Sequence, residues 1–419
     1  MQEALSKRRN INALVGEKAG FYFGLSLAGP YTVLTALAAQ LTTSAVAIGS
    51  ITTIWNGALF LPVVFVARWI RGHTERMPIV RKALFSRAVA FPLIALWLLL
   101  TRAANPGLTL AIMIAGMLLF CLSDGTNSIP YVDVIARIMT SQERARMTWR
   151  GMLAGGLLGI LGGLIVQYFL TPGVLAFPVN FAVLLGLAGV GFLFAWGSIS
   201  MVSERDVQAS RPHTIDGGAQ APRAARTILS HDAVYRRMLI TRFMTNIDQM
   251  AVPFYTVFAL NVLKMTPETV GWFVAAQTVG ALVAPILFGR LAERSGAHRV
   301  ILAGSIMQTL APLVALLVTI LASRNSVFSG LMVVIFTITG FSTSTMSLGF
   351  YNYPLDWCAD HERPNYLALL SVVSATAMLA PLIGGYIAQT ISYPFLFGAT
   401  SLLVGMGALV STTLPDKRH

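Results

Sequence analysis

Twelve apolar stretches, each long enough to cross a lipid bilayer, constrain this chain more than any other feature. A transmembrane helix needs about 20 mostly apolar residues. Hydrophobic residues make up 55% of the 419 residues and charged residues only 11%, whereas soluble domains average about 25% charged. The approximate limits of the stretches are 19–42, 45–67, 83–101, 108–129, 151–170, 179–201, 238–260, 269–288, 300–322, 327–350, 366–389 and 394–414. The sequence therefore predicts an all-α integral membrane protein with twelve transmembrane helices.

The distribution of the 30 Lys and Arg residues supports this count and orients the chain. When the stretches are threaded in and out with the N-terminus inside, all of them except Arg102, Lys264 and Arg324 lie on one face. Cytoplasmic loops retain basic residues, so that face is predicted to be cytoplasmic, together with both termini. The short loops and the compact linker favour a bacterial inner membrane.

The same asymmetry explains the formal net charge of +13. In a soluble protein such a charge would suggest a nucleic-acid partner. Here we expect no nucleic acid, and contact of the basic loops with anionic lipid headgroups instead.

The chain divides into two halves around a polar segment. Six stretches lie in residues 1–201 and six in residues 238–419, and residues 202–237 form the predicted cytoplasmic linker. Similar elements recur in the two halves: Tyr131-Val132-Asp133 and Gly162-Gly163 in the first, and Tyr353 with Asp356 and Gly384-Gly385 in the second. We interpret the halves as two pseudo-symmetric six-helix bundles.

A loop motif carries a family resemblance. Residues 289–299, between the eighth and ninth stretches, read Gly-Arg-Leu-Ala-Glu-Arg-Ser-Gly-Ala-His-Arg. This resembles the loop signature of the major facilitator superfamily, at the positions Gly289, Arg290, Glu293, Arg294, Gly296 and Arg299. Residues 265–271 and 380–385 are also similar to superfamily motifs. The resemblance implies the twelve-helix fold of that superfamily, with spans one, four, seven and ten around a central cavity.

The resemblance is sharp only in the C-terminal half. The corresponding loop at 68–78 lacks the acidic–Arg–x–Gly core, and the fifth stretch lacks the proline of the drug-antiporter motif. For Glu293 we hypothesise a latch at the cytoplasmic face that stabilises one access state, because a carboxylate is favourable beside a helix N-terminus. An ordinary solvated loop charge is the alternative.

Two acidic residues are expected inside the membrane, where ionisable groups are usually paired or line a pathway. Asp248 lies near the middle of the seventh span and Asp124 lies in the fourth. At helical spacing Asp248 shares a face with Thr241, Thr245 and Tyr255, and Asp124 shares one with Asn127, Ser128 and Tyr131. Asn246 and Gln249 flank Asp248 and are expected to contact ligand, and Tyr31 and Tyr351 are expected to line the cavity.

Burial in a membrane favours the neutral form of a carboxyl group and lets it exchange protons. Asp248 is therefore expected to carry proton coupling, with substrate binding and a structural hydrogen bond as open alternatives. For Asp124 the structural alternative has more weight. No basic residue is expected deep in a span, so neither acid has a predicted basic partner; Arg242 comes closest. The amides of Asn56, Gln277 and Gln308 are expected to bond between helices, and Asp133 to pair with Arg137 at a helix end.

These observations predict a secondary active transporter that works by alternating access. The chain has no P-loop, which argues against direct nucleotide drive. We expect no cofactor and no metal site, and an ion gradient, protons first, as the energy source. The absence of a predicted buried basic cluster argues against polyanionic substrates, so a small neutral, amphiphilic or cationic molecule is expected, with efflux favoured.

Alternatives remain in two classes. An uptake symporter or facilitator for a sugar-like or other metabolite is the alternative transporter. A non-transporting membrane sensor built on a transporter scaffold is the alternative of a different class. An enzyme is not expected, because all six His residues fall in predicted loops or tails without metal-ligand spacing. We expect a monomer.

Overall fold

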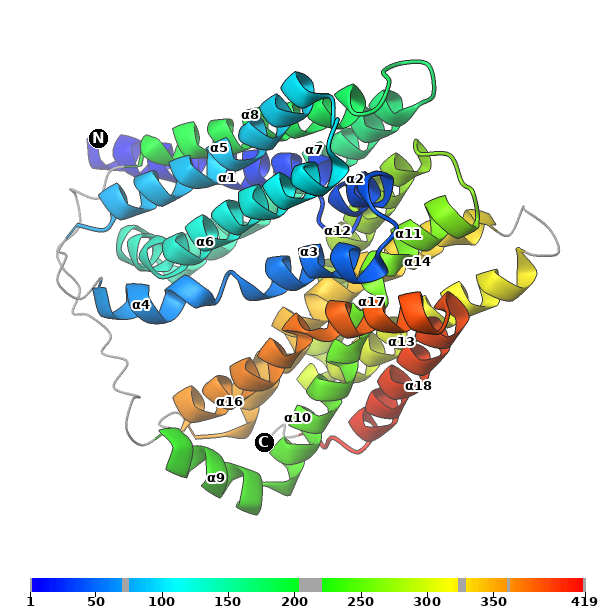
Figure 1. Cartoon of the computed structure of the whole chain (residues 1–419). Helices are drawn as coiled ribbons and strands as arrows, with labels where there is room; N and C mark the ends of the chain where they lie inside the picture. The colour runs from blue at the N-terminus through cyan, green and yellow to red at the C-terminus, as the bar shows by residue number, and fades with distance from the viewer. Residues whose placement is uncertain (1, 70–74, 203–220, 323–328, 360–361, 417–419) are drawn as a thin grey trace. The chain divides into compact units, whose positions relative to one another are not determined.

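The computed structural model describes residues 2–69, 75–202, 221–322, 329–359 and 362–416 (Figure 1). Within these ranges all regular structure is helical. Nine helical segments of the described chain are long and apolar enough to cross a membrane. The predicted all-α membrane fold is therefore confirmed. The nine segments correspond to the predicted spans other than the first, seventh and tenth, and the count of twelve stays a prediction.

The first, seventh and tenth predicted spans are helical but interrupted. The first consists of α1 (Gln2–Leu27) and α2 (Val33–Leu41). The seventh consists of α10 (Ala233–Thr245), the 3-10 helix η2 (Asn246–Met250), α11 (Val252–Val257) and the π-helix η3 (Phe258–Val262). The tenth consists of α14 (Leu331–Thr345), the π-helix η5 (Met346–Phe350) and α15 (Asn352–Trp357). Because proline lacks a backbone N–H and its ring clashes with the preceding turn, Pro30 and Pro253 account for the first two interruptions.

Several helices begin earlier or end later than the apolar stretches predicted. α1 begins at Gln2 instead of residue 19, and α5 (Met77–Thr101) begins before residue 83. α7 (Ser141–Leu170) begins ten residues before the predicted limit, at a capping box in which Thr140 Oγ1 accepts from the Glu143 N–H. Hydropathy locates the apolar part of a helix, whereas caps of this kind fix where its polar turns begin. As a result, charged residues assigned to loops lie in helices.

Part of the predicted linker is also helical. Residues 203–220 lie outside the described residues, but α9 (Ala221–His231) occupies the second half of the segment. The Asp232 side chain caps the next helix by accepting from the Tyr235 N–H at 2.8 Å. The described part of the predicted linker is therefore mostly helical, with α10 already beginning at Ala233.

The chain forms two compact units. Unit 1 comprises Met1–Thr43, Ile54–Pro212 and Thr266–Ala275, and unit 2 comprises Ser44–Thr53, His213–Met265 and Ala276–His419. Two helices, α3 (Ala45–Gly57) and α12 (Thr269–Ser295), divide between the units.

Unit 1 contains α4 (Leu61–Trp69), α6 (Pro106–Ile138) and α8 (Val179–Ser200) in addition to α1, α2, α5 and α7. α1 packs along α7 and α8, and α5 packs between α6 and α8. Close approach of α1 and α7 depends on small residues. A Cβ at Gly155, for example, would collide with the Tyr22 ring.

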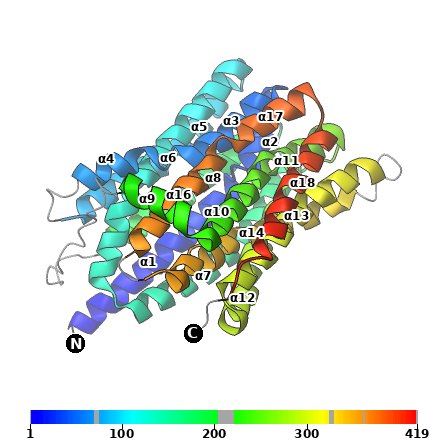
Figure 2. The same cartoon turned by 90° about the horizontal axis from the view of Figure 1, so that it is seen from below.

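Unit 2 is completed by α13 (Ala297–Leu321), α16 (Arg363–Ala375), the 3-10 helix η6 (Thr376–Met378), α17 (Ala380–Thr390) and α18 (Tyr393–Ser411). α18 runs along both α13 and α10, and α16 also packs on α10 (Figures 1 and 2). The short η2 segment packs against α17 and α18. The interruption of the seventh span therefore lies inside the packed interior of unit 2.

Candidate functional site

Asp248 lies in η2, where the seventh predicted span leaves the α-helical path. A continuous helix would place a bond from the residue 253 N–H to the Gln249 carbonyl, and Pro253 has no N–H to donate. The chain tightens into 3-10 geometry from Asn246 instead. The predicted common face of Asp248 with Thr241, Thr245 and Tyr255 assumed one uninterrupted helix, and that assumption is wrong.

Two neutral amides hold the Asp248 carboxylate. Gln249 Nε2 donates to Oδ1 at 3.1 Å, and Gln308 Nε2 of α13 donates to Oδ2 at 3.1 Å. The Asp248 residue is 7% exposed. It forms no ion pair with any residue that the structure describes. Asp248 is thus a buried carboxylate with neutral partners, and the prediction that Gln308 bonds between helices is confirmed.

Neighbouring polar groups attach η2 to α16. Asn246 Nδ2 donates to the Val373 carbonyl at 3.1 Å, and Arg242 Nε donates to Ser374 Oγ at 3.1 Å. The Arg242 guanidinium also lies over the Phe350 ring, 5.1 Å from its centroid. The Asn246 side-chain N–H is therefore used structurally, and its predicted contact with ligand remains untested.

The interior around Asp248 also contains buried polar atoms without partners. Tyr255 is completely buried against Phe336 and Phe397, and its hydroxyl has no hydrogen-bond partner in the described chain. Gln308 Oε1 is likewise buried and without a partner there. A buried polar atom costs free energy when it has no hydrogen-bond partner. Unit 2 therefore has unused polar groups close to a buried carboxylate. Tyr351 is 39% exposed, and its predicted place in the cavity lining remains a prediction.

Unit 1 contains a second buried polar centre, built on Arg87 of α5. Arg87 Nη1 donates to Asp124 Oδ1 at 2.6 Å, and Nη2 donates to Glu17 Oε1 at 3.4 Å. Tyr131 donates from its hydroxyl to Glu17 Oε2 at 2.9 Å. Three helices, α1, α5 and α6, are joined by this network. The prediction that Asp124 has no basic partner is therefore wrong, because Arg87, inside the stretch predicted at 83–101, pairs with it.

Aromatic rings surround the Arg87 guanidinium. Its Cζ lies 4.7 Å from the Phe21 ring centroid and 5.9 Å from those of Phe120 and Phe192. The Arg87 side chain is 3% exposed and the Glu17 side chain 7%. A guanidinium, which is weakly hydrated and stacks on aromatic faces, suits such a position better than an ammonium.

The other predicted positions in unit 1 separate into distinct roles. Tyr31 donates to Asn56 Oδ1 at 2.7 Å, so the expected bond of Asn56 between helices is confirmed. Asn127 is buried, and its Oδ1 has no partner in the described chain. The expected pair of Asp133 with Arg137 is present at 2.8 Å, and Arg76 joins it at 3.0 Å.

The loop motif proves to be mostly helical. Gly289, Arg290, Glu293 and Arg294 lie on α12, which ends at Ser295, and Arg299 lies on α13. Gly296 alone connects the two helices, with a φ of 82° that favours glycine. The motif is therefore a tight helix–helix connection instead of a long loop.

The sequence pointed to Asp248, Asp124, Tyr131 and Gln308 but missed Glu17 and Arg87. Both missed residues lie just outside the central part of their apolar stretches, in turns that hydropathy assigned to the ends of spans. One signal was available. Arg87 lies inside the apolar stretch predicted at 83–101, where an ionisable residue is usually paired or lines a pathway.

Comparisons with known proteins agree with this architecture. Residues 238–419 match the Major Facilitator Superfamily, and no curated protein matches the sequence. The fold is similar to that of a bacterial homologue of the iron transporter ferroportin in an inward-facing state, with a TM-score of 0.65, 13% identity and 98% coverage of both chains.

Two further solved transporters are similar. A mutant of the nucleoside transporter NupG gives a TM-score of 0.71 at 9% identity, covering 98% of this chain and 100% of that one. An auto-inhibited peptide transporter of the POT family gives 0.69 at 10% identity, covering 98% and 97%. Residues 238–419 are therefore assigned to the major facilitator superfamily by sequence, and nearly the whole chain has a fold similar to that of solved transporters.

Proposed function

We propose that this membrane transporter moves a small molecule by alternating access and is driven by protons that bind at Asp248. The observation that carries the proposal is the set of partners around the carboxylate. Both Asp248 oxygens accept from neutral amides, at 3.1 Å each. Protonation of this group therefore breaks no ion pair with a described residue.

The contrast with unit 1 supports the choice. Protonation of Asp124 would cost the charge-assisted bond from Arg87, which is 2.6 Å long and belongs to the strong class of hydrogen bond. Protonation is therefore less favourable for a carboxylate that accepts from a guanidinium than for one that accepts from neutral amides. We therefore assign the Arg87 network a structural role and Asp248 the coupling role.

The proposal also includes a substrate class and a direction of transport. We favour efflux of a neutral, amphiphilic or cationic molecule, by a monomer in a bacterial inner membrane with both termini cytoplasmic. Uptake of a metabolite is the second transporter function, and a non-transporting sensor is the alternative of a different class.

A flux assay tests the proposal. The full chain is reconstituted in proteoliposomes with an imposed pH gradient and offered a panel of organic cations, sugars, nucleosides, peptides and divalent metal ions. The last three classes are included because the similar structures are those of a nucleoside transporter, a peptide transporter and a homologue of an iron transporter. Ligand binding without flux for any compound would indicate a sensor.

The matched variants are Asp248→Asn and Asp356→Asn, the latter at an exposed position on α15. We expect Asp248→Asn to abolish gradient-driven transport while Asp356→Asn leaves it unchanged. Full gradient-driven transport by Asp248→Asn would contradict the assignment of coupling to this residue.

A further inference from the structure

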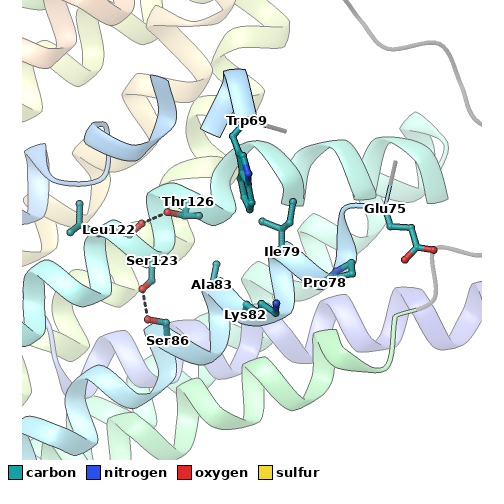
Figure 3. A pocket seen from close by; sticks show the side chains of 10 residues that line it. All are labelled: Trp69, Glu75, Pro78, Ile79, Lys82, Ala83, Ser86, Leu122, Ser123 and Thr126. Atoms are coloured by element: carbon teal, nitrogen blue, oxygen red, sulfur yellow. Dashed lines mark hydrogen bonds between the residues drawn. The ribbon is translucent and has the colours of Figure 1, made fainter. Parts of the chain in front are cut away.

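Unit 1 contains a cavity that the proposed transport cycle does not use. It has a volume of about 660 Å³ and lies between α4, α5 and α6 (Figure 3). This volume is within the range of sites that bind small ligands. Its lining changes from polar to apolar to charged from one end to the other.

The inner end is polar and fixed. Ser123 Oγ of α6 donates to Ser86 Oγ of α5 at 3.0 Å. The next residue of each helix belongs to the buried pair of Arg87 and Asp124. Two successive bridges therefore hold α5 and α6 at a constant separation here, so the cavity does not collapse at this end.

The middle of the cavity is apolar. Ile79 and Ala83 line it from α5 and Leu122 lines it from α6. Trp69 extends from α4 toward these side chains, as Figure 3 shows. Tryptophan is enriched where membrane proteins meet the headgroup region. A surface of this kind suits an acyl chain.

The outer end presents one acid and one base, Glu75 and Lys82. Both residues are exposed, both line the cavity, and neither forms a hydrogen bond or ion pair with a described residue. Lys82 lies near the start of α5, and Glu75 lies two residues before that helix begins at Met77.

Two other cations that the structure describes near this end are engaged. Arg76 pairs with Asp133 at 3.0 Å, and Arg81 donates to the carbonyls of Ser200 and Val202 at 2.9 and 3.1 Å. Among the described residues that line the cavity, Glu75 and Lys82 are therefore one negative and one positive charge available to a ligand.

We propose that this cavity binds a zwitterionic phospholipid from the surrounding bilayer. Its phosphate pairs with Lys82, its ammonium pairs with Glu75, and one acyl chain lies along Ile79, Leu122 and Trp69. Phosphatidylglycerol, an anionic phospholipid, has no ammonium to pair with Glu75 and places its negative charge beside that carboxylate. The charge pattern therefore selects the zwitterionic class, and the apolar wall selects a lipid over a free headgroup.

Native mass spectrometry of the full-length protein tests the proposal. The protein is delipidated in detergent and titrated separately with phosphatidylethanolamine, phosphatidylcholine and phosphatidylglycerol. We expect retention of a zwitterionic lipid, weakened about tenfold by Lys82→Gln and by Glu75→Gln, as loss of one charge-assisted contact implies. Arg146→Gln, at an exposed cation of α7 outside the cavity, is the matched control.

Two outcomes would overturn the proposal. One is equal or tighter binding of phosphatidylglycerol, which would show a site for phosphate alone. The other is retention unaffected by both cavity variants, which would show only annular lipid. Because Glu75 and Lys82 are exposed, both variants are expected to fold, and a thermal unfolding curve checks this. The readout needs no transport, so its failure is distinguishable from failure of the coupling assignment.

Discussion

Gln308 donates from Nε2 to Asp248 Oδ2 at 3.1 Å, and this bond joins α13 to the 3-10 segment that interrupts the seventh predicted span. An ionised carboxylate accepts from Gln308 and Gln249 together. A protonated carboxyl group carries an O–H on one of its two oxygens, and that O–H competes with the amide N–H that now donates there. A change of charge at Asp248 therefore changes how α13 is held against η2.

Replacing Gln308 with Leu removes one of the two donors to Asp248. A hydrogen bond to a charged group contributes about 1.5–3 kcal/mol, so we expect gradient-driven transport to fall at least about tenfold and its pH profile to move. The measurement is initial flux as a function of pH. Gln277→Leu is the control, because the Gln277 side chain is half-buried and makes no hydrogen bond with a described residue. Identical pH profiles for the two variants would count against a role of Gln308 in coupling.

Replacing Arg87 with Met leaves Glu17, which is buried, and Asp124, whose side chain is 27% exposed, without their guanidinium. Breaking a buried ion pair from one side costs about 3–5 kcal/mol, so the melting temperature in detergent should drop sharply. Adding Asp124→Asn to Arg87→Met should recover part of the loss, because an unpaired charge is removed. A double variant no more stable than Arg87→Met alone would show that the pair contributes little.

Replacing Gly384 with Ala should displace the segment that carries Asp248. A Cβ at Gly384 would collide with the Met250 carbonyl at the end of η2. Overpacking of this kind costs about 1–3 kcal/mol, and we expect transport to fall more than stability. Gly398→Ala on α18 is the control, since the nearest atom to its Cβ would be Leu316 Cδ2 at 3.7 Å. Flux and melting temperature are measured for both variants, and equal flux would contradict the prediction.

Glu293 lies in the last turns of α12. A carboxylate near a helix C-terminus is on the unfavourable side of the helix dipole, which supports a role beyond local helix stability. If Glu293 belongs to the predicted latch, Glu293→Gln should alter transport rate and the balance of access states while the melting temperature stays nearly unchanged. Cysteine accessibility from each side of the membrane reports that balance. Unchanged rate and unchanged accessibility would remove the latch hypothesis.

The amino-acid sequence alone predicted much of this protein, because membrane helices leave strong local signals. Apolar length identified the helices, and the basic residues predict their orientation. The position of Asp248 inside an apolar stretch marked it as exceptional without any structure, since the cost of burying a charge depends on depth more than on detailed packing.

Tertiary structure decided which buried groups meet. Hydropathy placed Arg87 near a loop and Glu17 before the first span, yet the packing of α1, α5 and α6 buries both and gives Asp124 a cation. Likewise, the helical spacing around Asp248 failed at Pro253, where the chain tightens and turns the carboxylate toward Gln308. Periodicity describes one helix at a time. The partners of a buried charge are set by the other helices, whose approach depends on small residues and caps far away in the sequence.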